Sequence, residues 1–271
     1  MNDVNKGVNK KSKAFVNLVR EKMGGEEFRN FKERNEFIKK QKEFIESITR
    51  VKEKFLSLRI DNPYKKFKEG EEQLKNGVAN AVIQFSEYGW YTNYSFSLID
   101  ITEAYKLLKK RNINEFDKYM SARIYEQYAE IKKSLFNRHP DRVGPLEAAF
   151  KAHDMKEYFL SIPVFLAQTD GISKDLSQLQ FFLNNKDYSP KVSYWAKETP
   201  KMWLHIALCA ALLDKGAFQK HYSQPNEIEI TRHSVLHGES SDYGSKLNSL
   251  KAISLLIYIS DIMSPRAIAF H

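Results

Sequence analysis

Apolar side chains recur every three to four residues along most of this sequence, a spacing that places them on one face of an α-helix. No segment shows the sustained apolar–polar alternation that is typical of β-strands. Glycine (11) and proline (8) are scarce among the 271 residues, which favours long helices over a turn-rich β architecture. The sequence therefore predicts an all-α protein.

The predicted helices divide the chain into two parts. Residues 1–110 form an N-terminal helical region that contains a long, charged, amphipathic helix over 26–58, and residues 111–271 form a C-terminal helical bundle. Proline and Asp-Gly signals then give the boundaries of the other helices, with 186–197 as a loop, Asp170-Gly171 as a helix end and Ser245 as a cap. The further helices are expected over 71–88, 100–110, 114–137, 145–151, 155–169 (kinked or divided at Pro163), 200–213, from about 226 to 238, and from 245 onwards.

Composition indicates a cytoplasmic protein. The single cysteine, Cys209, excludes an internal disulfide framework and fits a reducing compartment, where it is expected as a small buried hydrophobe. The basic N-terminus is not followed by the apolar core of a secretory signal, and no apolar run has the length of a membrane span. We therefore expect no contact with a membrane.

The net charge of +9 attracts acidic partners, nucleic acid among them. Many of the lysines lie in the first sixty residues, where they are interleaved with glutamate, so an ordinary charged surface is the favoured interpretation and a nucleic-acid footprint the alternative. The aromatic cluster Trp90, Tyr91, Tyr94 and Phe96 is interpreted as a plug between helices rather than as a surface that stacks bases. Among the histidines, His205 is expected in the core.

The most informative segment is 231–243, TRHSVLHGESSDY. In it Arg232 and His237 have four residues between them, and the first of these is His233. This pattern resembles the R-x4–6-H motif of the HEPN superfamily, in which the first intervening residue is often polar. The segment 162–171, IPVFLAQTDG, is similar to one that recurs in bacterial HEPN-like proteins. The resemblance is confined to the C-terminal half.

The resemblance implies a HEPN-like helical bundle, frequent homodimers and metal-independent cleavage of RNA, in toxin–antitoxin or antiphage-defence systems. By this interpretation His237 is the general acid or base, Arg232 holds the phosphate, His233 assists, and Asp170 is a candidate acidic residue from an earlier helix. Histidine suits proton transfer near neutral pH, and arginine binds phosphate through two parallel hydrogen bonds. No cofactor or metal is implied, and an antitoxin or sensor protein is an expected partner.

Helix geometry complicates this interpretation. Five positions along an α-helix turn through about 500°, which leaves the Arg232 and His237 side chains roughly 140° apart. They converge only if the helix ends between them, if the arginine reaches around the helix, or if a second subunit completes the site.

Three alternatives remain open from sequence. His233 and His237 share a helix face and are a possible metal pair, with Glu239 or Asp242 as a third ligand. Arg232 and His237 are alternatively helix-end residues that bond nearby carbonyls. The whole C-terminal part is alternatively a non-catalytic HEPN-like module that binds a protein or a nucleic acid.

Overall fold

The structure is a computed structural model that describes residues 46, 50, 63–198, 203–213, 216–219 and 230–264. The chain divides into two compact units, Met1–Phe67 and Lys68–His271, and the description below concerns the second. The domain boundary expected at residue 110 lies inside this second unit. The predicted helix over 26–58 lies almost entirely outside the described residues, as do the predicted helix starts near 200 and 226.

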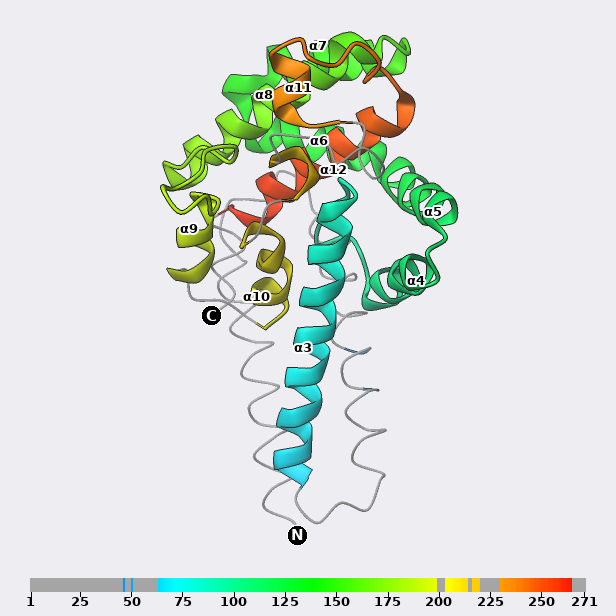
Figure 1. Cartoon of the computed structure of the whole chain (residues 1–271), viewed down its shortest axis with the longest axis vertical. Coiled ribbons are helices and arrows are strands. Elements are labelled where there is room, and N and C mark those ends of the chain that lie inside the picture. The colour runs from blue at the N-terminus through cyan, green and yellow to red at the C-terminus, as the bar shows by residue number, and fades with distance from the viewer. Residues whose placement is uncertain are drawn as a thin grey trace. The chain divides into compact units, whose positions relative to one another are not determined.

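Every regular element of the described residues is a helix, which confirms the all-α prediction (Figure 1). Outside the helices, the described residues contain one isolated antiparallel β-bridge, between Asn184 and Pro190. The elements in order are α3 (Pro63–Glu87), α4 (Leu98–Lys109), α5 (Ile113–Glu126), α6 (Tyr128–Arg138), η1 (Pro140–Arg142), α7 (Val143–Asp154), α8 (Tyr158–Ser177), α9 (Val192–Glu198), α10 (Trp203–Cys209), η2 (Ala210–Leu212), η3 (Ala217–Gln219), α11 (Arg232–Leu236) and α12 (Lys246–Ile262).

Helix α12 is the centre of the core. It is buried from Asn248 to Ser260 without a break, since apolar side chains cover nearly its whole circumference. It packs against α8, α5, α6 and α10, while α7 and α8 lie side by side (Figure 1). The predicted cap is confirmed, because the Ser245 hydroxyl accepts a hydrogen bond from the backbone N–H of Asn248. In the described ranges, no helix combines the length and the apolar character that crossing a bilayer requires.

The prediction of one continuous helix over 114–137 is wrong, since α5 ends and α6 begins at Gln127. The backbone N–H of Gln127 bonds to the carbonyls of both Ile124 and Tyr125, which tightens the last turn of α5. The Gln127 side chain accepts a hydrogen bond from Asn93 at 3.3 Å. The apolar stripe hides this break, because Ile124 and Ile131 are seven residues apart and both are buried, as they are in an unbroken helix.

Helix α8 continues through Asp170 and Gly171, so the predicted helix end at this pair is wrong. The helix ends instead at Gln178, which has a left-handed backbone conformation (φ 62°). Pro163 lies inside α8 without dividing it. The Asp170 carboxylate accepts a hydrogen bond from the backbone N–H of Phe182 at 3.1 Å. Asp170 therefore binds the loop that follows α8 and does not end the helix.

The loop predicted over 186–197 is also wrong in its second half, where α9 forms. Its polar composition conceals a short amphipathic helix that buries Val192. The next predicted helix is confirmed over α10 and η2, and Cys209 is buried there as expected. The plug interpretation of the aromatic cluster is confirmed for Trp90 and Tyr91, which are 0% and 1% exposed.

Candidate functional site

Helix α11 is a short helix with a well-defined start. The Thr231 hydroxyl accepts a hydrogen bond from the backbone N–H of Ser234 at 3.0 Å, and the Ser234 hydroxyl accepts one from the backbone N–H of Thr231. The helix that carries His233 therefore begins at Arg232. It ends where Gly238 takes a left-handed conformation (φ 72°), as the sequence predicts. Arg232 is thus the first helical residue and His237 the residue just after the last.

The Arg232 side chain is directed toward the segment after α8. Its guanidinium carbon lies 5.7 Å from the centroid of the Phe182 ring, within cation–π range. The side chain is partly buried, and its Nε is a buried atom with no hydrogen-bond partner among the described residues. Asp170 binds the same loop, through the Phe182 backbone and through Gln180 at 3.1 Å. Arg232 and Asp170 are therefore both neighbours of Phe182.

The two histidines of the segment form a separate, solvent-facing pair. The rings of His233 and His237 lie 4.4 Å apart between centroids, and His237 is exposed. The Nε2 atom of His233 lies 3.0 Å from a carboxylate oxygen of Glu239, which orients the ring. At the end of α11, His233 thus contacts both a second imidazole and a carboxylate. This arrangement is suited to proton transfer, since one ring can accept a proton while the other donates one.

Within one chain the structure places His233 with His237, and Arg232 with Phe182. The Arg232 and His237 side chains leave α11 in different directions, which agrees with the angle of a five-residue separation. The backbone N–H of His237 bonds to the carbonyl of His233 at 3.0 Å, which is the ordinary bond of a last helical turn and is separate from the capping alternative for the two side chains. Sequence gives Glu239 only as a possible metal ligand. Its contact with His233 depends on the turn at Gly238 and has no helical spacing signal.

The segment from Gly238 to Ser245 is fixed to the start of α8. The Tyr243 hydroxyl donates to the carbonyl of Phe159 at 3.2 Å, and the two rings meet edge to face at 5.1 Å. Asn248 donates from its side chain to the Tyr243 carbonyl at 3.0 Å. Gly244 packs so closely on the Phe159 ring that a Cβ there requires the ring to move. At its other end the backbone N–H groups of Glu239 and Ser240 bond to the Ser234 carbonyl, so the segment between His237 and α12 is held at both ends.

The metal alternative has no support in the described part of the chain, where no group of three or more His, Cys, Asp or Glu side chains is placed to bind an ion. Glu239 is bonded to His233, and Asp242 accepts a hydrogen bond from Ser240 at 2.9 Å.

The buried histidines have structural partners. His205 is 2% exposed, as predicted, and bonds to the Tyr94 hydroxyl. His139 lies 2.7 Å from the Ser260 hydroxyl, and burial lowers its pKa to about 4. His153 lies 2.7 Å from the hydroxyl of Ser249, and burial lowers its pKa too. These histidines join other segments of the chain to α10 and α12, and the two with a lowered pKa stay neutral at physiological pH.

No protein family model matches this chain, and no curated protein or solved structure is significantly similar to it.

Proposed function

We propose that this protein is a metal-independent endoribonuclease of the HEPN type. The observation that carries the proposal is the pair of a partly exposed His233 and an exposed His237, with the Glu239 carboxylate bonded to His233. The proposal rests also on the resemblance of the segment around Arg232 to the HEPN motif. By the same resemblance, the protein is a cytoplasmic toxin or antiphage-defence effector controlled by an antitoxin or a sensor protein.

The proposed reaction needs only proton transfer and charge stabilisation. His237 accepts the proton of a ribose 2′-hydroxyl, and the oxygen attacks the adjacent phosphorus. The bond from phosphorus to the 5′-oxygen breaks, His233 donates a proton to that oxygen, and a 2′,3′-cyclic phosphate remains. Arg232 holds the non-bridging phosphate oxygens and stabilises the extra negative charge of the transition state.

A second copy of the chain supplies the arginine in this proposal. Within one chain Arg232 packs on Phe182 while His237 packs on His233, so the complete site needs Arg232 of the other protomer. Exposed apolar side chains around the start of α8 support the proposal of a second copy. Met155, Phe159 and Leu160 are 62%, 50% and 63% exposed there, next to the Tyr243 segment. Exposed apolar groups of this kind are typical of interfaces.

The test is cleavage of labelled RNA in the presence of EDTA by wild type, His237→Ala, Arg232→Ala and the control Leu236→Ala. General acid–base catalysis contributes about 100-fold or more, so the first two variants are expected to lose at least that factor. Leu236 is a partly exposed neighbour on α11, and its substitution is expected to leave the rate unchanged. Inhibition by EDTA, or full activity of His237→Ala, contradicts the proposal.

Mixing the two inactive variants tests the shared site. If one protomer supplies Arg232 and the other His237, each mixed dimer has one intact site. Equal mixing then restores about a quarter of the wild-type rate, because about half of the dimers are mixed. A mixture as inactive as its components places the whole site within one chain.

A second candidate function is a non-catalytic HEPN-like binding module. The observation that favours it is the packing of Arg232 on Phe182, with its Nε buried. The same experiment separates the two functions. If folded wild-type protein leaves RNA intact at all concentrations, the binding module is the better assignment.

A further inference from the structure

Two tyrosines at the junction of α5 and α6 form a stacked pair on the surface. The rings of Tyr125 and Tyr128 lie 6.2 Å apart between centroids, with 21° between their planes. Tyr125 is 60% exposed, which is unusual for a large aromatic ring. The break at Gln127 sets the orientation of the pair, since Tyr125 belongs to the last turn of α5 and Tyr128 begins α6.

The Tyr128 ring is held in place by two residues of α7. The Tyr128 hydroxyl donates to Asp154 at 2.6 Å, and its ring packs against His153 at 5.4 Å. His153 in turn contacts Tyr158, the first residue of α8. A ring held in this way is a rigid support for a further planar group.

A lysine lies at each end of the pair. The Lys246 ammonium is 4.9 Å from the centroid of the Tyr125 ring, and that of Lys132 is 5.7 Å from the Tyr128 ring. Lys246 is exposed and can rotate. The Lys132 ammonium is 3.2 Å from Asp154, so this carboxylate offsets part of its charge.

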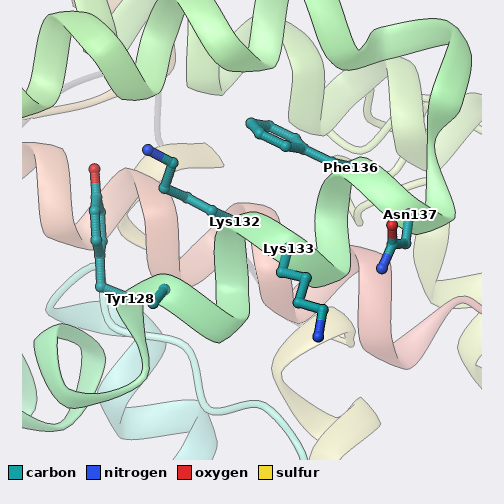
Figure 2. Close-up of a pocket in the computed structure, with 6 residues that line it drawn as sticks. Tyr128, Lys132, Lys133, Phe136 and Asn137 are labelled. Carbon is teal, nitrogen blue, oxygen red and sulfur yellow. The ribbon is translucent and has the colours of Figure 1, made fainter. Parts of the chain in front are cut away.

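Each tyrosine of the pair lines a shallow hollow of the surface. A hollow of about 470 Å³ follows α6, where Tyr128, Lys132 and Phe136 extend from one side of the helix (Figure 2). A second hollow of about 440 Å³ is lined by Tyr125, Lys246, Leu247 and Leu250, among others. Tyr128 thus lines the first hollow and Tyr125 lines the second.

We propose that Tyr125, Tyr128, Lys132 and Lys246 form a stacking platform for single-stranded nucleic acid. A base stacks on the Tyr125 ring, Lys246 rotates from that ring to the adjacent phosphate, and Lys132 binds the next phosphate. Interleaved aromatic and basic side chains are the general means by which proteins hold single strands. The net charge of +9 adds a favourable long-range field for a polyanion.

The platform is adjacent in the chain to the candidate catalytic residues. Lys246 follows His237 by nine residues, which span at most about 30 Å when extended. The segment between them is fixed to α8 by the contact of Tyr243 with Phe159, and Phe159 directly follows Tyr158. One strand can therefore extend from the platform to His237. In this respect the inference deepens the proposed function, since it locates the surface that holds the substrate.

The test measures binding of a fluorescent 2′-O-methyl RNA of about 10 nucleotides, which resists cleavage, to the full-length protein by anisotropy. Tyr125→Ala is expected to weaken binding by about 10-fold, while Tyr125→Trp retains it. Lys246→Gln is expected to reduce the slope of log K against log salt by about 0.7, the value for one lost phosphate contact to a single strand.

The matched controls are Tyr194→Ala, a 54% exposed tyrosine on α9, and Lys106→Gln, a 59% exposed lysine on α4. Both are expected to bind the strand as wild type does. Equal binding by Tyr125→Ala and wild type, equal losses in Tyr125→Ala and Tyr194→Ala, or no binding by wild type overturns the platform. Competition by duplex RNA as strong as that by the single strand also overturns it, because paired bases cannot stack on the ring.

Separate measurements of binding and of cleavage can contradict the platform and the nuclease proposal independently of each other. If Tyr125-dependent binding is found without cleavage of ordinary RNA, the platform stands and the nuclease proposal falls. If RNA is cleaved in a His237-dependent way while binding does not depend on Tyr125, the nuclease stands and the platform falls.

Discussion

At the scale of the residue, Gly216 is a position where only a hydrogen atom fits in place of a side chain. A Cβ there collides with the Tyr91 hydroxyl and lies 3.1 Å from the backbone oxygen of Ser86. Tyr91 is 1% exposed, so its ring cannot move away. We expect Gly216→Ala to lower the free energy of unfolding by about 1–3 kcal/mol, the usual effect of overpacking a core. Urea denaturation followed by circular dichroism measures it.

Gly77 provides the matched control. It lies inside α3, and a Cβ added there meets nothing within 4 Å. Gly77→Ala is expected to raise the free energy of unfolding by about 0.5–1 kcal/mol, because alanine loses less conformational entropy in a helix. Equal effects of the two substitutions contradict the packing described around Tyr91.

At the scale of the element, α12 holds the other helices together. Ile253 is 0% exposed in the middle of α12, so Ile253→Ala is expected to cost about 2–5 kcal/mol through lost burial and a cavity. Ile99 on α4 is 73% exposed, and Ile99→Ala is expected to change stability by less than about 0.5 kcal/mol. Thermal unfolding of both variants beside wild type checks the difference. A small loss in Ile253→Ala contradicts a central position for α12.

Sequence predicts these elements well where local signals decide, and poorly where distant contacts do. The Ser245 cap and the apolar helix after it are local, and both are correct. The break at Gln127 is stabilised by Asn93, which is 34 residues away, and Asp170 binds Phe182 instead of ending α8. The spacing of apolar residues within one segment carries no information about such distant contacts.

The candidate site shows the same limit. Spacing alone places Arg232 and His237 on different sides of a helix, and it places His233 and His237 together. It does not give the turn at Gly238 that returns Glu239 to His233, nor the packing of Arg232 on Phe182. The spacing of Tyr125 and Tyr128, three residues apart, is visible in the sequence. Buried tyrosine pairs have the same spacing, so it does not predict that this pair lies at the surface.

At the scale of the whole molecule, the buried histidines make stability depend on pH. His139 is 8% exposed and has a folded pKa of about 4, below the value near 6.5 of an unfolded chain. The unfolded state therefore binds more protons between these two values, and the free energy of unfolding falls as the pH is lowered through this range. The loss from His139 is on the order of 3 kcal/mol once the pH is below both values, because the two pKa values differ by about 2.5 and a tenfold difference in proton affinity corresponds to about 1.4 kcal/mol. His153, whose pKa is also lowered by burial, adds a loss of the same sign.

The variant His139→Gln isolates this contribution, because glutamine can still bond the Ser260 hydroxyl but does not titrate. Denaturant unfolding of the variant between pH 7 and pH 4 is expected to show a shallower loss of stability than wild type, even if the variant is less stable throughout. Parallel pH curves for wild type and His139→Gln would contradict this prediction. They would mean that His139 is protonated as easily in the folded protein as in the unfolded chain.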